Sequence, residues 1–310
     1  MMIDLLMVAG GLVLLVLAGD ALVKGAVNLS LRLGVPALIV GLTVVAFGTS
    51  APELLVSVEA VINDAPALAL GNVIGSNIAN ILLVLGIPAL ISVVPVSREL
   101  THDFLVMMGA SVLFIALAWV GPFGWMHGLA LLAGLGAMLW NSYSRAQAHR
   151  ASTELDLEGA DASISGLKIA LYLVGGLIGL PVGANLLVNG ATSIATALGV
   201  SEAVIGLTLV AVGTSLPELA TTIAAAIRKE AGVAMGNVIG SNIFNLLGII
   251  GIASLVGPIP VPEQMLRVDL WVMLAVSALL GIFVLTGRSI GKLAGVGLIA
   301  LYGGYLVSLF

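Results

Sequence analysis

Residues 48–53 read Gly-Thr-Ser-Ala-Pro-Glu, and residues 213–218 repeat this stretch as Gly-Thr-Ser-Leu-Pro-Glu. The two copies lie 165 residues apart, and the same offset keeps more than half of the surrounding positions identical. It also aligns Gly-Asn-Val-Ile-Gly-Ser-Asn-Ile at 71–78 with the same eight residues at 236–243. The chain is therefore an internal duplication in which each copy carries a glutamate directly after a proline.

The composition of this duplicated chain is typical of an integral membrane protein. Of its 310 residues, 60% are hydrophobic and 9% are charged, and the mean hydropathy is +1.21. Soluble domains carry about 25% charged residues, so we expect little mass outside the bilayer. The 39 glycines favour close packing of helices in lipid. The chain has no cysteine, which excludes disulfides and thiolate metal sites.

The apolar segments predict an all-α polytopic protein. A bilayer core of about 30 Å requires roughly 20 apolar residues per helix. Turn and charge signals divide the chain into ten predicted transmembrane helices, at 3–30, 36–62, 66–91, 101–120, 124–145, 166–197, 202–227, 232–257, 267–286 and 290–309. The first segment lacks a basic start and a cleavage site, so we interpret it as a retained helix and not as a signal peptide.

The basic residues predict how these helices are oriented. Ten of the 11 lysines and arginines fall on one side of the predicted membrane, and only Arg267 falls on the other. Basic residues favour the cytoplasmic side. We therefore expect a multi-pass protein of the plasma (inner) membrane with both termini outside.

The duplication predicts two five-helix repeats, at 1–145 and 166–310, joined by a cytoplasmic linker at 146–165. Because five is an odd number, the second repeat enters the membrane from the opposite side. Such inverted-topology repeats are common in secondary transporters, which bind their substrates near the midplane between the repeats. The linker carries several acidic residues but has Ser165 where an EF-hand loop requires glutamate. A solvated linker is therefore favoured over a calcium-binding loop.

Glu53 and Glu218 lie near the middle of the second and seventh predicted helices. An ionised carboxylate at a helix centre costs about 2.5–3.5 kcal/mol, so two such acids imply a ligand, a proton or a polar cavity. Pro52 lacks an N–H and crowds the carbonyl of the preceding turn, so we expect a broken helix with free carbonyl oxygens at 46–48. The seventh helix should break in the same way. Carbonyls, hydroxyls and carboxylates together favour a hard cation.

Polar side chains also recur one helical turn apart in each copy. They are Asn72, Ser76 and Asn80, and Asn237, Ser241 and Asn245. Small polar residues often serve only as hydrogen-bonding contacts between membrane helices. Two matched sets beside two Pro-Glu breaks favour an ion site, whereas Asn77 and Asn242, which lie about 100° away, are expected to bond between helices.

The remaining acids favour structural roles. Asp20 has Asn185 as its counterpart, and we expect it near a helix end. Asp103 and Asp269 each open a predicted helix, where a carboxylate interacts favourably with the helix dipole. The sequence contains no metalloprotease, nucleophile-elbow or phosphate-loop motif. An intramembrane enzyme would also require an asymmetric nucleophile and base, which two near-identical halves do not offer. A passive channel is a further alternative.

The two motifs resemble the alpha repeats of the calcium/cation antiporter superfamily, specifically its prokaryotic sodium/calcium exchanger-like branch. The resemblance covers essentially the whole chain and implies a central site formed by helices 2, 3, 7 and 8. It implies ligands from the side chains of Glu53, Glu218, Thr49, Ser50, Thr214, Ser215, Ser76, Asn80, Ser241 and Asn245, and from the backbone carbonyls of Ala46 and Ala211. Some relatives have aspartate at position 245, so the asparagine disfavours potassium co-transport.

This resemblance implies antiport of Ca²⁺ for Na⁺ by alternating access. The proton-coupled branch typically has Asn-Ala near the acidic motif, whereas this chain has Thr-Ser in both copies. We expect the transported Ca²⁺ and Na⁺ and the lipid bilayer as partners, with no covalent cofactor and no nucleic acid. The alternative is a Ca²⁺/H⁺ antiporter in which Glu53 and Glu218 carry protons. Helices 1 and 6, which are long and related by the repeat, are candidates to slide.

Overall fold

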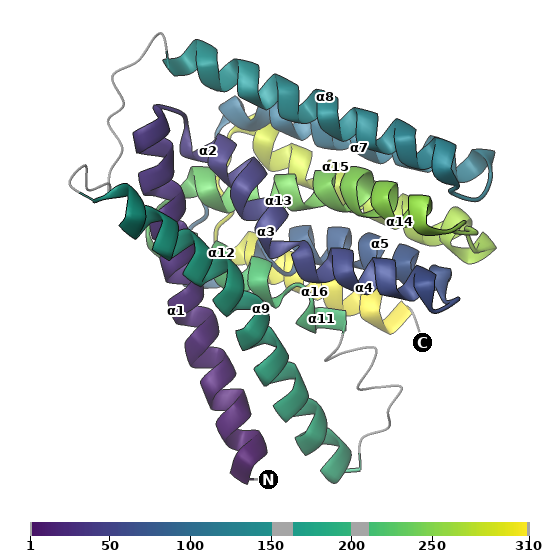
Figure 1. Cartoon of the computed structure of the whole chain (residues 1–310), viewed down its shortest axis with the longest axis horizontal. Helices are drawn as coiled ribbons and strands as arrows, with labels where there is room; N and C mark the ends of the chain where they lie inside the picture. The colour runs from purple at the N-terminus through teal and green to yellow at the C-terminus, as the bar shows by residue number, and fades with distance from the viewer. Residues whose placement is uncertain (1, 151–163, 200–210, 309–310) are drawn as a thin grey trace.

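The computed structural model describes residues 2–150, 164–199 and 211–308. The secondary-structure elements in these ranges are all helices. Two helices of 32 residues, α1 (Met2–Leu33) and α9 (Gly166–Ala197), pack along each other and cross one side of the molecule. Figure 1 shows their lower halves, which include the N-terminus, projecting beyond the other helices. The prediction that these two helices are long is thus confirmed.

Glycines allow α1 and α9 to approach closely. A Cβ atom on Gly176 would lie 2.6 Å from the Cβ of Leu22, and one on Gly11 would lie 2.7 Å from the carbonyl oxygen of Gly183. Real Cβ atoms do not come so near to other heavy atoms. The glycine content noted in the sequence therefore serves this contact, as it does in many membrane helix pairs.

The other helices form a bundle beside this pair. The first repeat contributes α2 (Ala37–Val40), η1 (Gly41–Val45), α3 (Ala46–Thr49), α4 (Ala51–Ile62), α5 (Pro66–Leu82), α6 (Gly86–Ile91), η2 (Arg98–Leu100), α7 (Thr101–Val120) and α8 (Trp125–Arg150). The second contributes α11 (Ala211–Gly213), α12 (Leu216–Ile227), α13 (Ala231–Ile243), η4 (Phe244–Ile249), α14 (Ile250–Val256), η5 (Met265–Asp269), α15 (Leu270–Thr286) and α16 (Lys292–Ser308).

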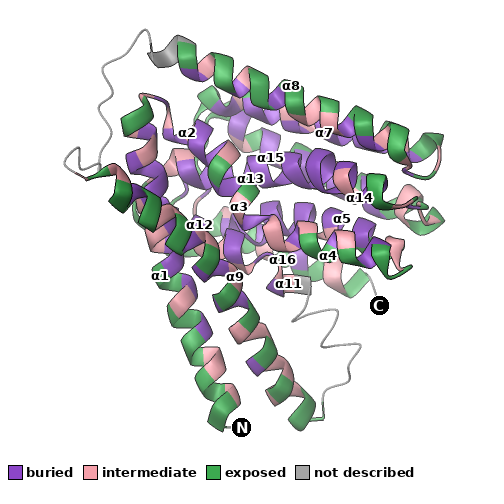
Figure 2. Cartoon of the chain, in the orientation of Figure 1, coloured by how far each residue is buried: buried purple, intermediate pink, exposed green. Residues whose placement is uncertain are grey.

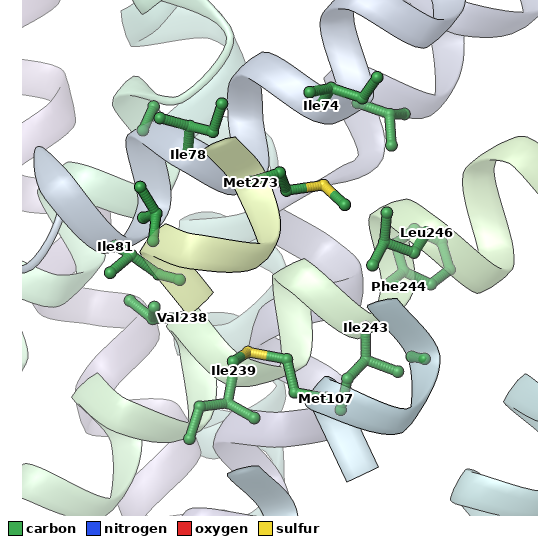
Figure 3. Close-up of a cluster of buried hydrophobic side chains, with 14 of the residues drawn as sticks. Ile74, Ile78, Ile81, Met107, Val238, Ile239, Ile243, Phe244, Leu246 and Met273 are labelled. Atoms are coloured by element: carbon green, nitrogen blue, oxygen red, sulfur yellow. The ribbon is translucent and has the colours of Figure 1, made fainter. Parts of the chain in front are cut away.

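The helices α5 and α13, which carry the duplicated Asn-Ser stretch, lie at the centre of the bundle. Every residue of α13 from Val233 to Ile243 is buried, and Figure 2 shows this helix as almost continuously buried. Apolar side chains from α5, α13, η4, α7 and α15 fill the space around it, including Ile78, Ile239 and Met273 (Figure 3). The polar residues of the two central helices are thus surrounded by an apolar core.

Local geometry repeats between the two halves. Ser50 and Ser215, at the helix breaks, have almost the same backbone angles, φ −86° and ψ 8° against φ −86° and ψ 3°. Asp64 and Lys229, 165 positions apart, both adopt positive φ, 58° and 61°, where the chain turns from one helix into the next. Positive φ is uncommon for residues other than glycine, so its recurrence at matched positions shows that the duplication extends to backbone conformation.

Six helical segments in the described residues are long and apolar enough to cross a membrane, and a bent pair, Ala37–Thr49 with Ala51–Ile62, makes a seventh. The six are Met2–Leu33, Pro66–Ile91, Arg98–Val120, Gly166–Ala197, Ala231–Val256 and Met265–Thr286. Three predicted spans fall outside this set. The helix α8 has several polar residues, α16 has 17 residues, and the start of the span at 202–227 lies outside the described residues.

One predicted boundary needs correction. The helix α8 continues to Arg150, so the linker predicted at 146–165 begins inside a helix. The third predicted span, 66–91, is confirmed as one apolar segment, Pro66–Ile91, within which residues 83–85 form turns between α5 and α6. Its counterpart in the second repeat remains helical but widens to a π-helix over Phe244–Ile249. The two repeats therefore differ one turn after their shared Asn-Ser stretch.

A candidate cation-binding site

The first broken helix places Glu53 at the start of α4. The helix α3 ends at Thr49, and α4 begins at Ala51 after a bend of 44°. Pro52 occupies the first turn of α4. Backbone N–H groups in a first turn make no hydrogen bond within the helix, so the N–H that proline lacks is not needed there. The break therefore falls between the glycine and the proline, as predicted, and Glu53 lies in a first helical turn, where the helix dipole favours a negative charge.

The second copy builds the same arrangement. The short helix α11 ends at Gly213 and α12 begins at Leu216, with Pro217 and Glu218 in its first turn. Both glutamates are buried, each with 1% of its surface exposed. Ser50, three residues before Glu53, bonds to the side chain of Glu218. The structure thus brings two acids that are 165 residues apart in the sequence into one buried region.

A hydroxyl group of the first repeat bonds to Glu218 of the second. Ser50 donates a hydrogen bond of 2.8 Å from its hydroxyl to Oε1 of Glu218, so this hydroxyl does not cap its own helix. Because Ser50 and Glu218 belong to different copies, the site is shared between the two repeats.

Most buried oxygens without a hydrogen-bond partner belong to the predicted ligand set. Nine buried side-chain oxygens in the described residues lack a partner, and seven of them come from residues that the sequence assigned to the ion site. The seven are Glu53 Oε2, Asn80 Oδ1, Thr214 Oγ1, Ser215 Oγ, Glu218 Oε2, Ser241 Oγ and Asn245 Oδ1. A buried polar atom without a partner costs about 1–3 kcal/mol. Such a concentration of unpaired oxygens suits a cation.

Asn72 and Asn237 brace the two helix breaks. Asn72 donates from Nδ2 to the backbone oxygen of Glu53 at 3.1 Å and to Ser57 at 3.0 Å. Asn237 donates to the backbone oxygen of Glu218 at 3.3 Å and to the hydroxyl of Thr222 at 3.1 Å. These amides hold the turns that carry the acids. Asn72 and Asn237 lie on the same helix faces as the predicted ligands, so helical spacing alone does not distinguish these two bracing residues from ligands.

The two halves differ at the first residue of each Thr-Ser pair. The hydroxyl of Thr49 donates to Asn237 Oδ1 at 3.1 Å, and the carbonyl of Ala46 lies 3.3 Å from it. That carbonyl also accepts the backbone N–H of Ser50 at 3.1 Å, so the prediction of a free carbonyl at position 46 is wrong: the helix closes its last turn before the break. Thr214 Oγ1 has no partner. The roles of Ser76, which is buried, and of Ala211, which begins α11, stay predictions.

Asn77 and Asn242 bond across the centre of the bundle, as predicted. Each amide lies near the backbone oxygen of the other residue, at 3.5 Å and 3.4 Å. Each also accepts a hydrogen bond from a predicted ligand of the opposite repeat, since Asn80 donates to Asn242 at 3.0 Å and Asn245 donates to Asn77 at 3.2 Å. These four amides form one network between α5 and the α13–η4 segment.

Asp20 and Asp103 lie in structural ion pairs, whereas Asp269, which was predicted to open a helix, is the last residue of η5 and directly precedes α15. Asp20 is in the interior of α1 and not near a helix end, which corrects the prediction, and it pairs with Lys24 of the same helix and with Arg228 after α12. Asp103 lies in the first turn of α7, as predicted, and pairs with Arg145 of α8. Among the described residues, no three His, Cys, Asp or Glu side chains cluster as a metal site. A cation at the centre would bind the two glutamates and neutral oxygens.

Comparison with known proteins decides the family. Residues 3–144 and 168–310 match the model of the sodium/calcium exchanger protein family. This chain belongs to that family. The sodium/calcium exchanger MaX1 of Methanosarcina acetivorans is 34% identical, with 99% of both chains covered. The inner membrane protein YrbG of Escherichia coli is 37% identical, with 96% of this chain and 93% of YrbG covered.

Solved structures agree with this membership. The sodium-calcium exchanger NCX_Mj, soaked with 10 mM Na⁺ and 10 mM Sr²⁺, has a TM-score of 0.86 and 36% sequence identity, covering 100% of this chain and 99% of that chain. The same exchanger without Na⁺ and Ca²⁺ has a TM-score of 0.83. The chain is thus a helical membrane transporter and not an enzyme, and the family resemblance seen in its motifs is confirmed.

Proposed function

We propose that this protein is an antiporter that exchanges Ca²⁺ for Na⁺ across the plasma membrane by alternating access. The observation that carries the proposal is the set of seven buried, unpartnered oxygens contributed by both repeats. Ca²⁺ takes 6–8 oxygen ligands from carboxylates, amides and hydroxyls. Two glutamates among them neutralise one divalent cation, and the same oxygens suit several Na⁺ ions.

The proposal assigns the oxygens to a shared ion cage. Glu53 and Glu218 supply its charge, and the neutral ligands are Thr49, Ser50, Thr214, Ser215, Ser76, Asn80, Ser241 and Asn245, with the carbonyls of Ala46 and Ala211. An empty cage holds two carboxylates that repel each other in a poorly polarisable interior. Binding of either ion relieves this repulsion, so the loaded protein crosses between its outward-open and inward-open states more readily than the empty one. This difference links Ca²⁺ movement to Na⁺ movement.

The proposed architecture is ten transmembrane helices in two inverted five-helix repeats, 1–145 and 166–310, with both termini outside and the connection at 146–165 in the cytoplasm. The matched backbone geometry at the helix breaks and at Asp64 and Lys229 supports the repeat. The near-exclusive placement of basic residues on one side supports the orientation. The helices α1 and α9 lie across the bundle, where a sliding motion would open one face and close the other.

The alternative is Ca²⁺/H⁺ antiport with the same glutamates as proton carriers. It is favoured by the burial of both acids in one region, because a proton on one of them would relieve the repulsion between two carboxylates. The Thr-Ser pair in both copies and the names of the relatives MaX1 and NCX_Mj favour sodium.

Ca²⁺ uptake into proteoliposomes separates the two forms of exchange. Vesicles loaded with Na⁺ are diluted into Na⁺-free buffer containing ⁴⁵Ca²⁺, with and without a protonophore. We expect uptake that requires internal Na⁺ and survives the protonophore. Loss of uptake with the protonophore, together with uptake driven by a pH gradient alone, would establish the proton-coupled alternative. Ca²⁺ flux without any counter-ion would indicate a channel.

A further inference from the structure

Asn77 and Asn242 lie outside the proposed ligand set, although both are buried where α5 meets α13. We propose that these two residues are positioning residues that decide which end of the Asn80 and Asn245 amides faces the ions. The inference rests on the proposed function, because it concerns two ligands of the proposed cage. It assigns a role to a polar network that ion binding alone does not explain.

Two methionines set the orientation of the positioning amides. Nδ2 of Asn77 lies 3.7 Å from the sulfur of Met273, and Nδ2 of Asn242 lies 3.8 Å from the sulfur of Met107. Figure 3 shows both methionine side chains among the buried apolar residues of the core. A thioether sulfur accepts hydrogen bonds and cannot donate them, so it selects the NH₂ end of an amide and not the oxygen end.

The backbone reinforces this selection. Beside each sulfur, the same Nδ2 atom meets a carbonyl oxygen, that of Asn242 for Asn77 and that of Asn77 for Asn242. A carbonyl is also only an acceptor. Reversing either amide would place its oxygen against a sulfur and a carbonyl, with no proton between them. The Oδ1 atoms of Asn77 and Asn242 are therefore directed away from the methionines.

The fixed oxygens then orient the two proposed ligands. Oδ1 of Asn242 accepts Nδ2 of Asn80, and Oδ1 of Asn77 accepts Nδ2 of Asn245. With the NH₂ ends held in these bonds, the Oδ1 atoms of Asn80 and Asn245 are left buried and without partners. A reversed amide would bring its NH₂ group toward the cation. The network thus presents two oxygens to the cage without adding charge.

The series of contacts from a methionine through a positioning amide to a ligand amide, here called the relay, occurs twice. This duplication argues against a chance arrangement. Asn77 and Asn242 are related by the 165-residue offset, and so are Asn80 and Asn245. Each chain of contacts begins at a methionine, passes through one amide and ends at another. The two chains cross between the repeats, because each positioning amide holds the ligand of the opposite copy.

Replacing a positioning amide tests the inference. Asn242→Leu keeps the size of the side chain but removes the acceptor that holds Asn80. We expect equilibrium binding of ⁴⁵Ca²⁺ to the purified protein to weaken roughly twofold to tenfold, the range for a lost hydrogen bond between neutral groups. Ser254→Ala is the matched control, because it removes another buried hydrogen bond, to the carbonyl of Gly251 on α14, and should leave the affinity unchanged.

A rescue experiment separates positioning from mere packing. Asn80→Asp carries an oxygen at both ends of the side chain, so its orientation no longer matters. In the Asn242→Leu background, this substitution should restore Ca²⁺ affinity by a larger factor than it gains in the wild-type background. An equal gain in both backgrounds, or wild-type affinity in Asn242→Leu, would overturn the proposal. If Glu53→Gln still abolishes exchange, the proposed function survives that failure.

A second variant covers the case in which Asn242→Leu does not fold. Met107→Leu combined with Met273→Leu removes both sulfur acceptors while keeping all four amides. Sulfur contacts are weak, so we expect a loss of Ca²⁺ affinity of roughly threefold or more. Unchanged affinity in this folded double variant contradicts the relay.

Discussion

Single residues around the two buried glutamates divide into those that hold the backbone and those whose oxygens remain available. Asn72 and Asn237 belong to the first group, because their amides bond to the backbone oxygens of Glu53 and Glu218. Ser215 and Ser241 belong to the second, since their hydroxyls have no partner. The distinction predicts different consequences for substitution, stability in the first group and ion binding in the second.

Asn237→Leu should destabilise the protein more than Asn72→Leu. Asn237 is fully buried and takes part in three hydrogen bonds, with Thr49, Glu218 and Thr222. Leaving these buried groups unpaired should cost about 2 kcal/mol or more, whereas Asn72 is half-buried and makes two bonds. The thermal unfolding midpoint in detergent measures the difference, and equal midpoints for the two variants would refute the bracing role.

Asn245→Asp should make Ca²⁺ uptake dependent on pH. Asn245 presents an unpartnered oxygen in the interior, so aspartate would add a third carboxylate to the proposed cage. Protonation of this group at low pH removes its charge, and uptake by the variant should therefore fall on acidification more than uptake by the wild type. Initial rates of ⁴⁵Ca²⁺ uptake between about pH 6 and 8 provide the test. A pH profile identical to that of the wild type would remove Asn245 from the ion pathway.

Among the helices, α1 and α9 depend on close contact at glycine. Gly176 faces Leu22 and Ala18 of α1 so closely that an added Cβ would lie 2.6 Å and 2.9 Å from their atoms. Gly175, the preceding residue of α9, faces open space. Gly176→Ala should therefore cost about 1–3 kcal/mol of packing energy and impair exchange, whereas Gly175→Ala should change neither. Exchange rates and unfolding midpoints of both variants test this, and a fully active, stable Gly176→Ala protein would contradict it.

Helix boundaries could be predicted from the sequence where a span is continuous and bounded by turn residues. Predicted spans at 101–120 and 166–197 coincide with α7 and α9. The end of α8 was predicted too early, because Arg145 and the polar residues after it signal the membrane surface and not the end of hydrogen bonding in a helix. The interruption at 83–85 and the π-helix over Phe244–Ile249 depend on packing at the centre, which hydropathy does not record.

The candidate ligands could be proposed from the sequence because their residues occur twice at fixed spacing. The duplication singled out Glu53 and Glu218, and helical spacing grouped Ser241 with Asn245. The bond from Ser50 to Glu218 and the methionine contacts of Asn77 and Asn242 join helices from different repeats. Such contacts follow from three-dimensional packing, so local spacing could not distinguish bracing amides from those that present an oxygen.

For the whole molecule, the duplication predicts that the two repeats cross the membrane with opposite orientations. The chain contains no cysteine, so single introduced cysteines report sidedness without background. A membrane-impermeant maleimide should label Ser308→Cys, near the C-terminus, on intact cells. It should label Gln147→Cys, an exposed residue at the end of α8, only after the membrane is opened. Labelling of both on intact cells would disprove the ten-helix orientation.

The account as a whole requires that Glu53 and Glu218 hold one Ca²⁺ between the two repeats. Equilibrium binding of ⁴⁵Ca²⁺ to purified wild-type protein, Glu53→Gln and Glu218→Gln measures this most directly, with the unfolding midpoint confirming that each variant is folded. Removing either carboxylate should weaken Ca²⁺ binding by at least roughly thirtyfold, as expected for loss of one partner in a buried charge interaction. Wild-type Ca²⁺ affinity in either folded variant would contradict the shared cage.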